Sequence, residues 1–166
     1  MAGGQERILR RRIKSVESTK KITRAMELIA ATRVVKAQDR AHAARPYSDE
    51  ITGVIVDLML AGAAKDHPLL RADSEATTDL FVLVTSGRGL CGAYNSAVTR
   101  AAEREMNRRK AAGRDVEIVA IGNKAINYFK SRATIVAQRS GVTDQPSYED
   151  ARAIGDAVRP GFEEGR

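Results

Sequence analysis

Three glycines and one cysteine form the segment of this sequence whose residue types most clearly suggest chemistry. Gly87, Gly89 and Gly92 match the pattern G-x-G-x-x-G, and Cys91 lies within it. The segment follows an apolar run typical of a β-strand and precedes a predicted helix, which is the context of a dinucleotide-binding loop. There, glycines let the backbone approach a pyrophosphate, and the N–H groups of the helix N-terminus bind it. Nucleotide binding is one hypothesis for this loop, and a structural turn is the other.

Residues that would complete a dinucleotide site are not found where they are expected. A ribose-binding acid belongs at the end of the next strand, about 20 residues further on. Residues 121–124 there read Ile-Gly-Asn-Lys, and Glu117 comes too early in the strand. The sequence of this region also predicts about three strands, whereas a dinucleotide-binding fold, built from two mononucleotide-binding halves, needs six. We therefore favour a structural turn formed by Gly87, Gly89 and Gly92, with no cofactor.

Cys91 is the only cysteine, so it cannot form an internal disulfide, and we expect an intracellular, reducing environment. A thiolate at a helix N-terminus can act as a nucleophile, but it needs a base. The only histidines, His42 and His67, fall in other predicted elements. We expect Cys91 to be a small, buried core residue. Neither histidine has neighbours at zinc-ligand spacings and no calcium-loop pattern occurs, so no metal site is predicted.

A long helix precedes the glycine segment. Residues 5–52 contain no glycine and only one proline, Pro46. We expect a helix over residues 1–61, and one of roughly 55 residues would be about 80 Å long, more than the diameter of a compact domain of this size. An apolar stripe with helical spacing runs along it, so most of the helix should project and need a partner to cover that face. The stripe consists of Leu9, Ile13, Val16, Ile22, Met26, Ile29 and Val34.

The excess of positive over negative charge is confined to this helix. Residues 1–45 hold 12 Lys and Arg against 4 Asp and Glu, a net charge of +8, while residues 46–166 hold 16 against 17, a net charge of −1. A basic helix fits nucleic acid, an anionic membrane surface or a protein rich in carboxylates. A DNA duplex offers nothing to cover Ile22, Met26 and Ile29, so we favour a protein partner.

After a connecting loop over residues 62–78, the sequence alternates between strand and helix patterns. This alternation predicts a small, three-layer βαβαβα domain with a mostly parallel sheet over residues 79–166, an α/β fold. The apolar run at 80–84 should be buried on both faces of the sheet. Ser147 and Asp150 form a helix start signal. Strands are expected at 80–84, 116–121 and 134–137, and helices at 95–110, 123–131 and 147–159.

Five segments together closely resemble the gamma subunit of bacterial F-type ATP synthases. They occur in the family's order and at its spacing, over residues 1 to about 150, so the resemblance is specific. They are KKITRAMELIAATRVVKAQ at 20–38, ARPY at 44–47, HPLL at 67–70, GRGLCGAYN at 87–95 and IGNKAINYF at 121–129.

This resemblance implies a non-catalytic rotor subunit. In that family the N-terminal helix is half of an antiparallel coiled coil, which forms the central stalk inside the ring of alpha and beta subunits. The small Rossmann-like domain lies at the lower end of the stalk and contacts the epsilon subunit and the c-subunit ring. Proton-driven rotation of that ring turns the stalk, which drives ATP synthesis at the beta subunits. The expected location is peripheral, on the cytoplasmic face of the cell membrane, through the complex.

The resemblance also implies a contact surface on the helix, which would meet acidic segments of the beta subunits. Two departures from the family are present. Gly87 stands where the family usually has an acid, and the family's C-terminal helix and the last part of its sheet domain are absent from these 166 residues. A small nucleotide-binding enzyme using residues 87–92 and a basic nucleic-acid-binding module remain the alternatives. The contact surface is expected at Lys20, Lys21, Arg24, Met26, Arg33 and Lys36.

Overall fold

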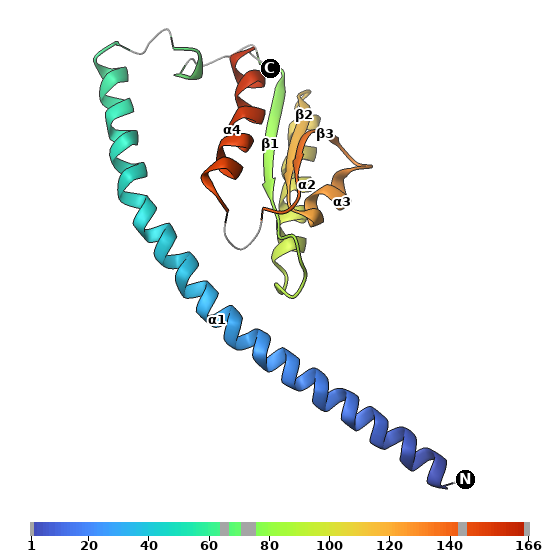
Figure 1. Cartoon of the computed structure of the whole chain (residues 1–166). Coiled ribbons are helices and arrows are strands. Elements are labelled where there is room, and N and C mark those ends of the chain that lie inside the picture. The colour runs from blue at the N-terminus through green and yellow to red at the C-terminus, as the bar shows by residue number, and fades with distance from the viewer. Residues whose placement is uncertain (1, 64–66, 71–75, 143–145, 165–166) are drawn as a thin grey trace. The chain divides into compact units, whose positions relative to one another are not determined.

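A computed structural model of the protein describes residues 2–63, 67–70, 76–142 and 146–164 (Figure 1). The chain divides into two compact units, Met1–Val54 and Ile55–Arg166. The elements, in chain order, are α1 (Ala2–Leu60), the short 3-10 helix η1 (Pro68–Leu70), β1 (Thr78–Val84), α2 (Tyr94–Ala111), β2 (Asp115–Ile121), α3 (Asn123–Phe129), β3 (Thr134–Arg139) and α4 (Tyr148–Glu163).

The predicted long N-terminal helix is confirmed. Helix α1 runs for 59 residues and continues through Pro46, whose missing N–H removes one backbone hydrogen bond. Every side chain from Gly3 to Leu60 is exposed. The seven residues of the apolar stripe are between 44 % (Met26) and 68 % (Val16) exposed. Within the described residues the stripe is therefore uncovered, as expected of a helix that packs against something else.

The second unit contains a parallel sheet with the strand order β1-β2-β3. Both strand pairs are parallel, and Val84, Ile121 and Arg139 are aligned at the carboxyl ends of the three strands. The predicted α/β fold with three parallel strands is confirmed. Because all three strands point the same way, the loops that follow them meet at one edge of the sheet, where α/β domains usually bind ligands.

Helices cover both faces of this sheet. Helices α2 and α3 lie on one face and α4 on the other (Figure 1), where α4 packs against η1 and, among the strands, mainly against β2 and β3. The main core lies between the sheet and the α2/α3 layer. Phe129 is 1 % exposed, and the central strand β2 is buried continuously from Ile118 to Ile121. The core is made of Leu83, Ala102, Met106, Val116, Ile118, Ala120, Ala125 and Phe129.

One strand prediction was wrong. The apolar run in β1 was expected to be buried on both faces, yet Val82 is 42 % and Val84 51 % exposed. Strand β1 is at an edge of the sheet, and the strands that α4 mainly contacts are β2 and β3. The strand buried on both faces is β2, because it is central and has a helix layer on each side.

Helix α4 begins as predicted and ends later than predicted. The Ser147 hydroxyl accepts a hydrogen bond from the Asp150 N–H at 3.1 Å, and the Asp150 carboxylate accepts one from the Ser147 N–H at 2.9 Å. The hydrogen bonds that the Asp150 carboxylate accepts from the Ser147 N–H and from the Ser147 hydroxyl lower the pKa of Asp150. The expected end at residue 159 was wrong: Pro160 lacks its own donor, but its carbonyl still accepts a hydrogen bond from the Glu164 N–H at 2.9 Å.

An ion pair joins β1 to the loop after α2. The Arg114 guanidinium donates to both Asp79 carboxylate oxygens, at 2.7 and 2.8 Å, and to the Ala76 carbonyl at 2.8 Å. The Asp79 side chain is 20 % exposed. The hydrogen bond from Arg114 is the main reason that the pKa of Asp79 lies below its usual value. Such two-pronged pairs are among the stronger charge-assisted hydrogen bonds.

We expect Asp79→Asn to destabilise the second unit by about 1–2 kcal/mol at pH 7. Because the pKa of Asp79 is lowered in the folded state, this stabilisation is present above the unfolded pKa of about 4 and is lost as pH falls through the folded-state value. Urea unfolding, monitored by tyrosine fluorescence, should therefore show a gap between variant and parent that shrinks towards pH 2. Asp156→Asn is the control, since its 3.8 Å pair with Arg152 is well exposed.

Candidate functional site

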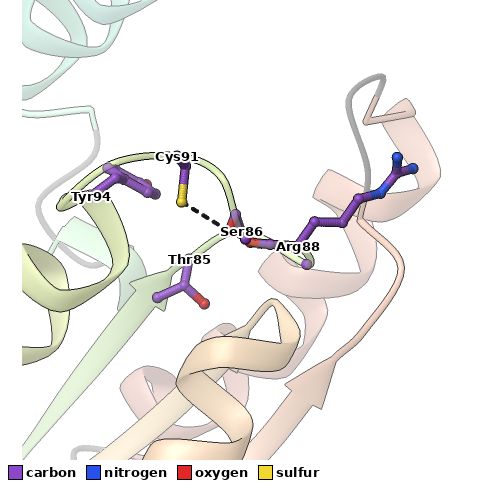
Figure 2. Close-up of a pocket in the computed structure, with 7 residues that line it drawn as sticks. Thr85, Ser86, Arg88, Cys91 and Tyr94 are labelled. Atoms are coloured by element: carbon purple, nitrogen blue, oxygen red, sulfur yellow. Dashed lines mark hydrogen bonds between the residues drawn. The ribbon is translucent and has the colours of Figure 1, made fainter. Parts of the chain in front are cut away.

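The loop between β1 and α2 lines a cavity in the second unit. It follows the carboxyl end of β1 and leads into the first turn of α2. The cavity has a volume of about 400 Å³ (Figure 2). Its lining includes Gly87 and Gly89 of the predicted glycine segment together with polar side chains from the strand end. The lining residues are Thr85, Ser86, Gly87, Arg88, Gly89, Cys91 and Tyr94.

Asn95, in the first turn of α2, holds this loop in shape. Its side-chain oxygen accepts a hydrogen bond from the Ser86 N–H at 2.9 Å, and its amide nitrogen donates to the Ser86 hydroxyl at 2.8 Å and to Cys91 Sγ at 2.9 Å. Figure 2 shows Cys91 pointing towards Ser86, with 3.6 Å between Sγ and Oγ. The Tyr94 hydroxyl donates to the Val84 carbonyl at 2.9 Å. These bonds connect the strand end, the loop and the helix start.

The prediction that Cys91 is a buried apolar core residue was wrong. The side chain is only half-buried, and its sulfur contacts two polar groups. The reason is the turn before α2, in which the Tyr94 N–H donates to the Cys91 carbonyl at 3.3 Å and the thiol comes within reach of the Asn95 amide. The sequence did contain the four-residue spacing of Cys91 and Asn95, but nothing in it indicated that Asn95 would turn back towards the loop.

The glycines of the loop differ in what they require. Gly92 has a φ of +58°, a conformation that favours glycine. Gly87 and Gly89 do not have a positive φ, and a Cβ atom on either would meet no atom within 4 Å. Leu90 has a φ of +62° and is 88 % exposed. The backbone conformation therefore favours glycine at position 92, whereas neither conformation nor space requires glycine at positions 87 and 89.

The chemistry available at this cavity is limited. Ser86, Cys91 and Asn95 are hydrogen-bonded to one another, and Arg88 extends away from them (Figure 2). The end of β2 offers Ile121, which is 3 % exposed, and no carboxylate that could bind a ribose. His67 is occupied elsewhere, since its Nδ1 accepts a hydrogen bond from the Leu69 N–H at 3.2 Å. No three side chains among the described His, Cys, Asp and Glu residues gather into a metal-ligand group.

Sequence reasoning missed a junction beside this cavity. The buried Thr85 hydroxyl donates to the Ile121 carbonyl at 3.0 Å and accepts from the Ala125 N–H at 2.9 Å. It thereby joins the ends of β1 and β2 to the start of α3. Gly122 lies against it with a φ of +89°, and a Cβ there would be 2.2 Å from the Thr85 carbonyl oxygen. The partners are 36 to 40 residues apart in the chain, so no local pattern reveals them.

The predicted contact surface on α1 separates into two groups. Lys20, Lys21 and Arg24 fall within an arc of about 100° around the helix axis, and together with Glu17 they line a groove of about 540 Å³. Met26, Arg33 and Lys36 fall within an arc of about 80° on another side. Arg24 is paired with Glu27 at 2.7 Å. All six side chains are exposed, but they do not form a single face.

Among the described residues, no helix combines the length and the apolar character needed to cross a bilayer. Helix α1 is long enough, but its many charged side chains exclude it.

Comparison with known proteins gives a consistent result. A family model described as ATP synthase matches residues 5–166. The ATP synthase gamma chain of Mycolicibacterium smegmatis is 46 % identical over 158 residues, which cover 94 % of this chain and 51 % of that protein. The gamma chain of Kineococcus radiotolerans is 43 % identical over 160 residues, 96 % of this chain and 53 % of that one. The chain therefore spans about half the length of the curated relatives it matches.

Proposed function

This chain belongs to the ATP synthase family that matches residues 5–166, and from that membership we propose that it acts as the central-stalk rotor subunit of a proton-transporting F-type ATP synthase. It would couple the proton-driven rotation of the c-subunit ring to ATP synthesis at the beta subunits. The observation that carries the proposal is the match to ATP synthase gamma chains over 94–96 % of the chain, combined with an uncovered apolar stripe on a 59-residue helix.

The exposed stripe on α1 supports the stalk role. An apolar stripe of this length on an exposed helix marks a surface that another element covers. A second helix in a coiled coil is the cover that suits a torque-bearing element, because two packed helices resist bending and twisting better than one. We propose that α1 is half of such a coil, with the ring of alpha and beta subunits around it.

We propose further that Lys20, Lys21 and Arg24 are the part of α1 that meets acidic segments of the beta subunits. Their charges project from one side of the helix, and residues 1–45 carry a net charge of +8 against −1 for the rest of the chain. Long-range attraction between a basic helix and acidic segments would guide the stalk into the ring. Met26, Arg33 and Lys36 would contact the ring from the other side of the helix.

The subunit itself would perform no bond chemistry. The loop at residues 87–92 offers no ribose-binding carboxylate, and its thiol is engaged with Asn95 and Ser86. We propose that the loop shapes the second unit, which would contact the epsilon subunit and the c-subunit ring. Attachment to the cytoplasmic face of the cell membrane would then occur through the complex. No observation favours nucleotide binding or nucleic-acid binding over this role.

Assembly with a catalytic ring tests the proposal. We expect the 166-residue chain to co-purify with alpha and beta subunits from M. smegmatis, whose gamma chain is 46 % identical. ATP hydrolysis should stay weak with this chain alone and rise when the C-terminal half of the M. smegmatis gamma chain is joined to it. A folded chain that does not bind the ring would contradict the proposal, and calorimetric binding of ATP or NAD at micromolar concentration would favour the enzyme alternative.

A triple charge-reversal variant tests whether these three residues form a specific contact surface or act only through the total charge of the chain. Lys20→Glu, Lys21→Glu and Arg24→Glu together should weaken ring binding by roughly tenfold or more. The matched control carries Arg104→Glu, Lys124→Glu and Lys130→Glu, which change the net charge equally at exposed positions of the second unit. Equal losses in both triplets would show that only total charge matters and would remove the assignment of a specific surface.

A further inference from the structure

Two apolar groups near the ends of α1 have the same spacing. Leu9, Ile13 and Val16 follow one another at steps of four and three residues, and so do Ile51, Ile55 and Leu58. The first members, residues 9 and 51, are 42 residues apart, which is six heptads. All six side chains are between 40 % and 68 % exposed. We call these two groups and the positions between them at the same steps the heptad seam.

Such a repeat has a geometric consequence. A straight helix drifts by about 20° per heptad relative to a strict seven-residue repeat, so six heptads would place the two groups about 120° apart. They share one face only if α1 supercoils around another helix. The spacing therefore indicates a helical partner as long as α1 itself, rather than a globular surface.

The residues in the middle of the heptad seam are mainly small, which lets two helix backbones approach closely, while the bulky residues lie at its two ends. Three seam positions in the middle hold other polar residues, Lys20, Glu27 and Ser48. The small and medium residues of the middle are Thr23, Ala30, Val34, Ala37, Ala41 and Ala44.

Charge along α1 decides which partner and which orientation suit it. Residues 5–24 hold 8 basic and 2 acidic side chains, a net charge of +6, whereas residues 46–60 hold no basic side chain and three acidic ones, Asp49, Glu50 and Asp57, a net charge of −3. Two parallel copies would place their basic ends, each with a net charge of +6, side by side, which is repulsive. Two antiparallel copies would place the basic end of each helix beside the acidic end of the other, which electrostatics favours.

We propose that the free chain forms a homodimer in which the heptad seams of two α1 helices pack in antiparallel orientation. Leu9, Ile13 and Val16 of one copy then lie against the Ile51, Ile55 and Leu58 end of the other, and the twofold axis passes near Val34. The interface is self-complementary, so each contact occurs twice. This inference goes beyond the stalk role, because it concerns the chain before assembly, when a second copy occupies the heptad seam, which shares Leu9, Ile13, Val16 and Val34 with the apolar stripe.

Sedimentation velocity of the 166-residue chain provides the first test. We expect a dimer at tens of micromolar. Ile13→Asp should raise the dimer dissociation constant by roughly tenfold or more, because the substitution occurs twice per dimer. Ile8→Asp is the matched control, since Ile8 is 57 % exposed against 58 % for Ile13 but lies off the heptad seam. A monomer, or equal effects of the two substitutions, would overturn the proposal, as would larger aggregates that Ile13→Asp leaves unchanged.

Cross-linking tests the orientation. In a Cys91→Ser background, Ile13→Cys and Ile51→Cys variants are treated with a short bis-maleimide, separately and as a mixture. In the antiparallel dimer the two copies of position 13 are about 60 Å apart, so cross-linked dimers should form only in the mixture. Efficient cross-linking of Ile13→Cys alone would show a parallel pair and reject the proposal.

A charge swap tests the electrostatic argument. Asp49→Lys with Glu50→Lys should weaken the dimer by roughly tenfold, because the acidic end of α1 becomes basic. Glu149→Lys with Asp156→Lys changes the net charge of the chain equally, at exposed positions of α4, and should have a much smaller effect. Equal weakening would contradict the antiparallel pairing. All three experiments use the isolated chain, so their failure would leave the stalk role, which is tested by ring assembly, unaffected.

Discussion

Replacing Gly122 by alanine should prevent the second unit from folding stably, with a loss of more than about 3 kcal/mol. Two causes act together. The φ of +89° with a ψ of 144° is a backbone conformation that only glycine adopts readily, and an added Cβ would be 2.2 Å from the Thr85 carbonyl oxygen. That oxygen belongs to the backbone at the end of β1, so the clash cannot be relieved by turning a side chain.

Two other glycines separate these causes. Gly113→Ala carries the conformational strain alone, because its φ is +78° and a Cβ would meet no atom within 4 Å. We expect it to cost about 1–2 kcal/mol. Gly87→Ala has neither problem and should change stability by less than about 0.5 kcal/mol. Urea unfolding followed by tyrosine fluorescence would rank the three variants, and a Gly122→Ala variant no less stable than Gly113→Ala would refute the close approach to Thr85.

Removing the Phe129 ring should cost about 3–5 kcal/mol. Phe129 is 1 % exposed, ends α3, and packs edge-on against Tyr128 with 4.9 Å between the ring centroids. Phe129→Ala would leave a cavity between α3 and the sheet that neighbouring side chains could fill only in part. For a domain whose total stability is of order 5–15 kcal/mol, this is a large fraction.

The matched control for this substitution is Tyr148→Ala on α4, because Tyr148 is also aromatic but is 76 % exposed. It should change stability by less than about 0.5 kcal/mol. Phe129→Leu, which keeps most of the volume, should fall in between. If Phe129→Ala unfolded at the same urea concentration as Tyr148→Ala, the placement of Phe129 at the centre of the core would be wrong.

The amino-acid sequence by itself determined the local elements and their order. Periodic apolar residues predicted the long basic helix and the alternation of strands and helices, because these patterns depend on neighbours within one or two turns of chain. The capping box at Ser147 and Asp150 was predictable for the same reason. The resemblance to gamma subunits came from whole segments of sequence, and the family match over residues 5–166 agrees with it.

Only the tertiary structure decided which distant groups meet. It showed that β1 is an edge strand with Val82 and Val84 exposed, that Cys91 turns towards Asn95, and that Arg114 holds Asp79 across the end of the sheet. It also revealed the junction of Thr85 with Gly122 and α3, which no glycine pattern indicated. These features depend on how strands pair and how far a helix layer extends, and such contacts join residues tens of positions apart that leave no periodic signal in the chain.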